Sequence, residues 1–264
     1  MKGPALLFCP GDRSDRYEKA LAAADSVILD LEDAVAPEDK PSARERLAAS
    51  ALDPARVIVR VNPASGADHP LDLAALAATP YRTVMLAKAE GAGDVEALHA
   101  AGHRVLALCE TALGVERAAE IAAHPAVIGL MWGAEDLIAS MGGRSSRNDD
   151  GRYRDVARYA RSRVLVAAKA VGKLAIDAVH VDIPDIEGLR AEVSDAAASG
   201  FDATACIHPS QAAVIREGYA PTAQQTAWAE RVLAAAEQQP GVFRFEGAMV
   251  DEPVLRQARA ILRR

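Results

Sequence analysis

The chain has 264 residues, of which half are hydrophobic and a quarter are charged, as is typical of a folded globular protein. Its 37 acidic and 30 basic residues give a formal charge of −7. This charge argues against nucleic-acid binding, because proteins of that class carry a basic face. The cysteines Cys9, Cys109 and Cys206 lie in apolar runs without metal-ligand spacing, so we expect free buried thiols. Neither a signal peptide nor an apolar window near ~20 residues is found, so we expect a cytoplasmic protein without a membrane span.

Short apolar runs recur along the chain and alternate with alanine-rich amphipathic segments. The runs are continuous, as is typical of parallel strands that are buried on both faces. The expected strands are Ala5–Cys9, Val27–Leu31, Val57–Val61, Thr83–Ala87, Arg104–Cys109, Val127–Met131, Leu174–Ala178 and Ala203–Ile207. Helices are expected between them, for example at Arg16–Ala24, Ala92–Ala101 and Arg158–Gly172. Eight strand–helix repeats predict an α/β fold, a (β/α)8 TIM barrel.

Two segments depart from this regular pattern. Residues 139–154 are polar and arginine-rich, and the sequence leaves open whether they form a lid or a plain solvated connection. After the eighth strand we expect a helix at Thr222–Glu237, two short alternating runs about Gly247, and a last helix from Pro253. We therefore expect a catalytic barrel over residues 1–218. A C-terminal helix and lid extension over residues 219–264 is expected to belong to the same domain.

Charged residues follow the strands at the end that carries the active site in barrels of this kind. Acidic residues outnumber basic ones there: Glu32, Asp33, Glu110, Glu135, Asp136 and Asp177, against Arg13, Arg60 and Lys88. Neighbouring carboxylates repel unless a cation joins them, so we expect at least one pair to bind a divalent ion such as Mg²⁺. For any single carboxylate, an ion pair or a helix cap is the alternative.

The basic residues at the same strand ends indicate an anionic substrate. Arg60 ends a buried strand, where an unpaired guanidinium is costly, so it requires an acidic partner or a substrate carboxylate. Arg13 and Lys19 flank a turn and a helix start, where a phosphate can bind, although such charges can also be merely solvated. A Schiff-base role for Lys88 is disfavoured, because nearby carboxylates raise the pKa of a lysine.

Ten segments, in order along the chain, resemble the citrate lyase beta-subunit-like proteins of the HpcH/HpaI aldolase superfamily, close to malyl-CoA and citramalyl-CoA lyases. They are LLFCPGDRSDRYEKAL, SVILDLEDAVAPEDK, VIVRVNP, TVMLAKAE, LALCETALGV, GLMWGAEDL, YARSRVLVAAKA, AIDAV, GFDATACIHPSQ and FEGAMVDEPV. This resemblance implies Mg²⁺-dependent carbon–carbon cleavage, or its reverse, of a 3-hydroxyacyl-CoA. The products would be acetyl-CoA and an α-keto acid such as pyruvate or glyoxylate.

The resemblance also implies roles for individual residues. Glu110 of CETALG and Asp136 of WGAEDL match the two Mg²⁺ ligands, and Arg60 of VRVNP matches the clamp on the keto-acid carboxylate. Arg13 and Lys19 match contacts to coenzyme A phosphates, within the segment PGDRSDRYEK.

Further residues are expected to support these roles. Asp251 of GAMVDEP resembles an acid/base residue that a neighbouring subunit supplies within a homotrimer, or a multiple of one. Backbone N–H groups where a helix would start are expected to stabilise an anion, those of Gly133, Ala134 and Glu135. Three residues are expected to orient Arg60 or metal-bound waters without binding the metal: Glu32, Asp33 and Lys88.

Two other functions stay open at this point. The chain could be a citryl-acyl-carrier-protein lyase subunit that works only in a complex. The chain ends soon after its last expected helix, which favours free CoA thioesters over that alternative. It could also be a non-catalytic barrel that binds metabolites, but a decayed site usually loses one of its key residues, and Arg60, Glu110, Asp136 and Asp251 are all present.

Overall fold

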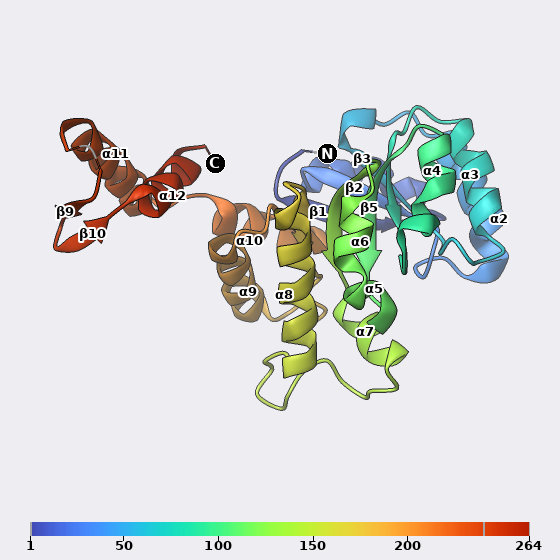
Figure 1. The fold of residues 1–264 in the computed structure, drawn as a ribbon. Coiled ribbons are helices and arrows are strands. Elements are labelled where there is room, and N and C mark those ends of the chain that lie inside the picture. Colours follow the sequence, from blue (N-terminus) through green and yellow to red (C-terminus); the bar gives the residue numbers. More distant parts are fainter. Residues whose placement is uncertain (1, 240, 264) are drawn as a thin grey trace. The chain divides into compact units, whose positions relative to one another are not determined.

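A closed barrel of eight parallel strands forms the main body of the protein (Figure 1). The computed structural model describes residues 2–239 and 241–263. Each strand pairs with its neighbours in sequence, and β8 closes the ring by pairing with β1. The strands are β1 (Ala5–Pro10), β2 (Ser26–Asp30), β3 (Val57–Val61), β4 (Thr83–Leu86), β5 (Arg104–Cys109), β6 (Val127–Trp132), β7 (Leu174–Asp177) and β8 (Ala203–Cys206). The predicted (β/α)8 barrel is confirmed, with every strand boundary within one residue of its expected position.

Helices between the strands surround the barrel (Figure 1). The α-helices are α1 (Tyr17–Ala23), α2 (Lys40–Ala48), α3 (His69–Ala77), α4 (Glu96–Ala100), α5 (Ala112–Glu116), α6 (Ala118–Ala123), α7 (Ala134–Ser140), α8 (Asp155–Ala170), α9 (Ile186–Ser199) and α10 (Pro209–Tyr219). Short 3-10 helices are η1 (Ser14–Arg16), η2 (Pro37–Asp39), η3 (Pro54–Arg56) and η4 (Ala92–Val95). Local sequence explains the bounds of α9, because Asp185 caps its first turn and Gly200 ends it with a left-handed φ of 104°.

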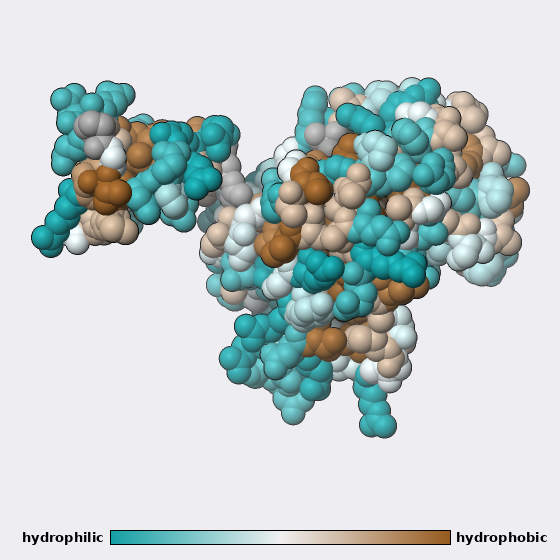
Figure 2. All heavy atoms as spheres, viewed as in Figure 1, coloured by the Kyte–Doolittle hydropathy of each residue, from teal (hydrophilic) through white to brown (hydrophobic). Residues whose placement is uncertain are grey.

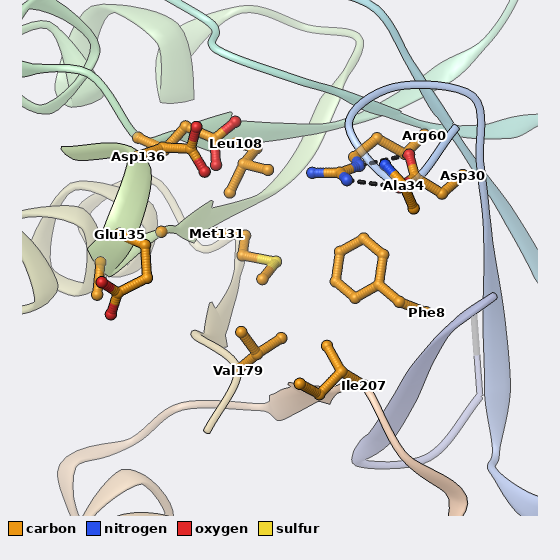
Figure 3. A pocket seen from close by; sticks show the side chains of 13 residues that line it. Phe8, Asp30, Ala34, Arg60, Leu108, Met131, Glu135, Asp136, Val179 and Ile207 are labelled. Carbon is orange, nitrogen blue, oxygen red and sulfur yellow. Dashed lines mark hydrogen bonds and ion pairs between the residues drawn. The ribbon is translucent and has the colours of Figure 1, made fainter. Parts of the chain in front are cut away.

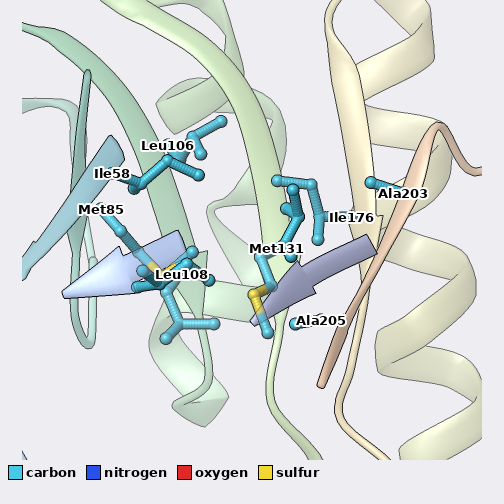
Figure 4. Close-up of a cluster of buried hydrophobic side chains, with 10 residues drawn as sticks. Ile58, Met85, Leu106, Leu108, Met131, Ile176, Ala203 and Ala205 are labelled. Carbon is cyan, nitrogen blue, oxygen red and sulfur yellow. The ribbon is translucent and has the colours of Figure 1, made fainter. Parts of the chain in front are cut away.

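Apolar side chains fill the inside of the barrel, and every strand contributes at least one of them (Figure 4). They are Leu6, Ile28, Ile58, Met85, Leu106, Leu108, Met131, Ile176, Ala203 and Ala205. This layered filling makes the barrel a packed core rather than a pore. Leu108 and Met131 also line the pocket described below, so the core forms its floor.

The segment between α7 and α8 is held against the barrel. Arg147 forms an ion pair with Glu192 of α9, with 2.5 Å between Nη1 and Oε1, and its guanidinium lies 3.9 Å from the ring centre of Tyr153. That ring in turn packs edge-on against Trp132 at the end of β6. Figure 2 shows a largely hydrophilic surface over this segment. The segment is thus a polar loop with specific anchors, not a plain solvated connection.

The chain divides into two compact units between Arg216 and Glu217, within α10. The second unit contains α11 (Ala223–Gln238), β9 (Phe243–Phe245), β10 (Ala248–Val250) and α12 (Glu252–Leu262). It has an apolar core of its own: Ala229, Val232, Phe243, Val250, Leu255 and Ala258. Its two helices and short strands lie where the sequence predicts them, and the roles of this unit as a lid and as part of the barrel domain stay predictions. Among the described residues, no helix is both long and apolar enough to cross a membrane.

Candidate active site

A pocket of about 180 Å³ lies where the strands of the barrel end (Figure 3). It combines a charged part with an apolar part. The lining residues are Phe8, Asp30, Ala34, Arg60, Leu108, Glu110, Met131, Gly133, Ala134, Glu135, Asp136, Val179 and Ile207. Six of the predicted site residues are among them: Arg60, Glu110, Gly133, Ala134, Glu135 and Asp136.

Arg60 of β3 is held rigidly by two carboxylates. Its Nε and Nη2 donate to the two oxygens of Asp30 at 2.6 and 2.5 Å, and its Nη1 lies 3.1 Å from Glu32 Oε2. Burial alone would lower the pKa of Arg60, but the adjacent Asp30 raises it, so the guanidinium stays charged. Figure 3 shows it pointing into the pocket with Asp30 behind it. Each terminal nitrogen still carries a second N–H that a ligand can use.

Asp30 is the functional residue that the sequence analysis missed. It is fully buried, and its carboxylate also accepts the backbone N–H groups of Glu32 (2.9 Å) and Ala34 (3.1 Å). Glu32 and Asp33 were expected to orient Arg60 or metal-bound waters. Glu32 makes a single contact with Arg60, whereas Asp30 makes the bidentate one. A usable signal was present, since Asp30 and Arg60 end neighbouring strands and are register partners.

Glu110 and Asp136 approach each other from β5 and α7. The Glu110 side chain is buried, and among the described residues its one hydrogen bond comes from the backbone N–H of Lys88 (3.2 Å). Burial and the charge of Asp136 together raise the pKa of Glu110 to about 8. Asp136 is more exposed, and its Oδ1 lies 3.5 Å from Lys88 Nζ. Within residues 2–239 and 241–263, Glu110 therefore has no directly paired cation.

Gly133 permits this close approach of the two elements. A Cβ atom at this position would lie 2.7 Å from Glu110 Oε2 and 3.0 Å from Glu110 Cβ, so the Glu110 side chain would have to shift. Glycine therefore lets α7 begin directly beside the Glu110 carboxylate in its present position.

The Lys88 side chain connects Asp136 with the two acids that follow β2, Glu32 and Asp33. Its ammonium bonds to Glu32 and lies 2.9 Å from Asp33 Oδ2. Burial alone would lower the pKa of Lys88, but Glu32 and Asp33 raise it well above its usual range, which disfavours a neutral Schiff-base nucleophile.

The charges in this part of the pocket leave room for a divalent cation. Five carboxyl groups lie around two cations, Arg60 and Lys88, so three negative charges are uncompensated when all five are ionised: the groups are those of Asp30, Glu32, Asp33, Glu110 and Asp136. No cluster of three or more potential ligands from His, Cys, Asp and Glu occurs among the described residues. Two carboxylate ligands suit Mg²⁺, which commonly takes one or two from the protein and completes its shell with water and substrate oxygens. The residues present fit this ion.

Asp177 and Glu135 were expected among the acids of the site, and the structure gives both of them other partners. Asp177 accepts the indole N–H of Trp132 (2.6 Å) and pairs with Arg161 (2.8 Å), and it does not line the pocket. Glu135 lines the pocket, but its Oε1 accepts the hydroxyl of Ser146 (2.6 Å), and its carboxylate points away from Asp136 (Figure 3).

Arg13 and Lys19 do not line the pocket. Arg13 pairs with Asp15 at 3.0 Å, and Lys19 is exposed on α1. Asp251 caps α12 in the second unit, where its side chain accepts the backbone N–H of Val254 at 3.4 Å. The expected roles of Arg13, Lys19 and Asp251 stay predictions.

Comparisons with known proteins identify the family of this chain. The HpcH/HpaI aldolase/citrate lyase family model matches residues 5–209. A citrate lyase subunit beta-like protein of Mycobacterium tuberculosis is 58% identical over 262 residues, which cover 99% of this chain and 95% of that protein. The mitochondrial citramalyl-CoA lyase of Rattus norvegicus is 32% identical over 290 residues, covering 98% and 84%.

A solved structure has the same fold as this chain. The crystal structure of protein CitE from Mycobacterium tuberculosis, in complex with magnesium, acetoacetate and coenzyme A, superimposes with a TM-score of 0.96. It is 58% identical, and the match covers 99% of this chain and 97% of that one. The chain belongs to the HpcH/HpaI aldolase/citrate lyase family.

Proposed function

We propose that this lyase cleaves a 3-hydroxyacyl-CoA of the citramalyl-CoA type to acetyl-CoA and a monocarboxylic α-keto acid, and that it can catalyse the reverse reaction. The observation that carries the proposal is the carboxylate pair Glu110 and Asp136 beside Arg60 in one pocket. The family relatives support it, since one structure contains magnesium, acetoacetate and coenzyme A, and another relative is a citramalyl-CoA lyase.

Glu110 and Asp136 are the proposed ligands of Mg²⁺. When bound, the ion supplies positive charge at the oxygen that becomes negative as the carbon–carbon bond breaks. Glu110 is held in place by the backbone N–H of Lys88 and by the contact with Gly133. Its burial strengthens any charge interaction in the pocket, because the effective dielectric constant is lower there than in water.

Arg60 is the proposed clamp for the carboxylate of the keto acid. Because Asp30 occupies Nε and one N–H of Nη2, the free N–H groups on Nη1 and Nη2 form an end-on fork toward the pocket. A two-point contact of this kind fixes the orientation of the keto carbon for bond formation. Backbone N–H groups at the start of α7 are proposed to donate to a substrate oxygen, those of Gly133, Ala134 and Glu135.

The apolar part of the pocket selects the keto acid. Five large apolar side chains line the pocket: Phe8, Leu108, Met131, Val179 and Ile207. Figure 3 shows three of them, Phe8, Val179 and Ile207, opposite Asp136 and Arg60. Of the described residues that line the pocket, Arg60 alone is basic. A methyl group is favourable against the apolar side chains, whereas a second carboxylate would be buried without a partner. Pyruvate therefore fits the pocket better than oxaloacetate.

The remaining proposed contacts involve the acyl-CoA. Arg13 and Lys19 are proposed to bind the CoA phosphates at the β1–α1 turn, where Arg46 Nη1 donates to the Asp12 carbonyl (2.7 Å) and adds a third cation. Asp251 of a neighbouring subunit in a homotrimer is proposed to transfer the proton at the acetyl carbon. These proposals rest on the resemblance of the segments PGDRSDRYEK and GAMVDEP.

The test is a set of incubations with acetyl-CoA, Mg²⁺ and one keto acid each: pyruvate, glyoxylate or oxaloacetate. We expect mass spectrometry to show a hydroxyacyl-CoA with pyruvate, and none after addition of EDTA or with Glu110→Gln. A product with oxaloacetate in preference to pyruvate would contradict the proposed specificity. Release of free CoA alone would indicate hydrolysis instead of cleavage of the carbon–carbon bond. Activity only on a carrier-protein thioester would favour the citrate lyase subunit.

A further inference from the structure

Lys88 contacts both of the carboxylates that we propose as metal ligands. Its backbone N–H donates to Glu110 Oε1 at 3.2 Å, and its ammonium lies 3.5 Å from Asp136 Oδ1. The same ammonium bonds to Glu32 and to Asp33. One residue therefore connects the acids that follow β2 with the acids that follow β5 and β6.

The backbone of Lys88 is held in an unusual conformation. Its φ of 49° is in the left-handed region, which a residue with a side chain rarely adopts. The flanking residues Ala87 and Ala89 are fully buried, and their N–H groups donate to Val61 O (3.3 Å) and Leu108 O (3.0 Å). The ends of β3 and β5 thus impose the conformation on both sides. Unusual backbone of this kind persists only where the surrounding structure enforces it.

The position of the ammonium has a consequence for metal binding. A dication held by Glu110 and Asp136 has the same sign of charge as Lys88 and requires the same Asp136 carboxylate. Without the ion, the ammonium is the nearest compensation for the acids Glu32, Asp33 and Asp136. With the ion present, the two positive charges repel each other.

We propose that Lys88 is a built-in counter-ion, whose ammonium compensates the acid cluster in the metal-free protein and loses its contact with Asp136 when Mg²⁺ binds. The proposal rests on the metal ligands of the proposed function. It makes Lys88 a residue that stabilises the metal-free protein and weakens metal binding. A simple tether, which only orients Asp136, would instead support metal binding.

Lys88→Gln distinguishes the two roles, because glutamine can still donate a hydrogen bond but carries no charge. Lys88→Arg is the matched control that keeps the charge, and Lys88→Met is a second neutral variant. Mg²⁺ affinity is measured by isothermal titration calorimetry, and Tm is measured with EDTA and with Mg²⁺. For Lys88→Gln we expect a lower Tm in EDTA and Mg²⁺ binding tighter by about tenfold, as the loss of a like charge at short range predicts.

The opposite signs of these two effects are the signature of a counter-ion. Unchanged or weaker Mg²⁺ binding by both neutral variants would contradict the counter-ion role while leaving the proposed function intact. The counter-ion role would also be contradicted if Lys88→Arg bound Mg²⁺ as Lys88→Gln does, because the change in affinity would then not depend on the charge of residue 88. Wild-type protein that binds no Mg²⁺ would contradict the proposed function as well as this inference.

Discussion

Glu110 and Asp177 are both carboxylates at the ends of barrel strands, and both are nearly inaccessible, with exposures of 2% and 5%. Their surroundings are opposite. Asp177 has the indole of Trp132 and the guanidinium of Arg161 as partners. Glu110 accepts one backbone N–H and lies near the like-charged Asp136, while Arg60 and Lys88 act on it only through space. The two buried acids therefore differ in their partners: Asp177 has a directly paired cation, and Glu110, the proposed metal ligand, does not.

The strongest test of this difference is to neutralise Glu110. Glu110→Gln removes a proposed ligand, and we expect kcat/KM to fall by about 10³-fold, a loss of several kcal/mol of charge stabilisation. We also expect the metal-free variant to be at least as stable as wild type, because a buried carboxyl group that is costly to ionise is replaced by a neutral amide. Steady-state kinetics and urea unfolding measure the two effects. A large loss of stability with retained activity would place Glu110 with the structural acids.

The matched variant is Asp177→Asn, for which we expect the reverse. It leaves Arg161 with Asp195 as its remaining carboxylate partner, and breaking a buried ion pair lowers the free energy of unfolding by about 3 kcal/mol. Mg²⁺ affinity should stay at the wild-type value. Weakened Mg²⁺ binding in a folded Asp177→Asn protein would show that the two acids are not separate in function.

A substitution of Arg60, the proposed substrate clamp, should have a smaller effect on kcat/KM than Glu110→Gln. Arg60→Lys keeps the charge but loses the fork, and we expect kcat/KM for the keto acid to fall about thirtyfold, or about 2 kcal/mol. Arg44→Lys is the control, because Arg44 is also held by two carboxylates, Asp68 and Asp72, but does not line the pocket. It should alter stability and leave KM unchanged. Equal kinetic losses in both variants would exclude a specific role for Arg60.

The pH dependence gives the finest test. The folded pKa of Glu110, about 8, lies above its ordinary value of 4.5, so its protonated form favours folding. Its contribution to the stability of the metal-free protein is complete below pH 4.5 and is lost as the pH rises through about 8. Mg²⁺ requires the carboxylate, so its affinity should rise about tenfold from pH 6 to pH 7 and level off above pH 8. Isothermal titration calorimetry at several pH values measures this dependence. Asp177→Asn is the control and should show the same dependence as wild type. An Mg²⁺ affinity that does not change between pH 6 and pH 8 would contradict the role of Glu110.

The sequence was sufficient for the fold because parallel strands buried on both faces produce continuous apolar runs with clear ends. It also singled out Arg60, Glu110 and Asp136, which line one pocket in the structure. Their ligand and clamp roles came from the resemblance and stay predictions. The sequence could not separate Asp177 from them. The partners of Asp177 come from β6 and α8, and no local pattern announces a pairing between distant elements.

Asp30 and Lys88 show a second limit. Asp30 is the last residue of its strand, so its role depended on a register between two strands that a single sequence does not show. The left-handed backbone of Lys88 arises from hydrogen bonds to β3 and β5, and no glycine signals it. Both features are products of tertiary structure.

The close contact at Gly133 has a consequence for the choice of metal ion. The two proposed ligands come from different elements, and α7 begins against the Glu110 side chain without an intervening Cβ atom. Adding a methyl group there would displace the Glu110 carboxylate or α7 and so change the separation of the two carboxylates. Mg²⁺ binds at 2.0–2.1 Å with strict geometry, whereas Ca²⁺ accepts longer and more variable distances. In a saturation library, position 133 should therefore behave as a selectivity determinant, with small substitutions shifting preference from Mg²⁺ toward larger ions.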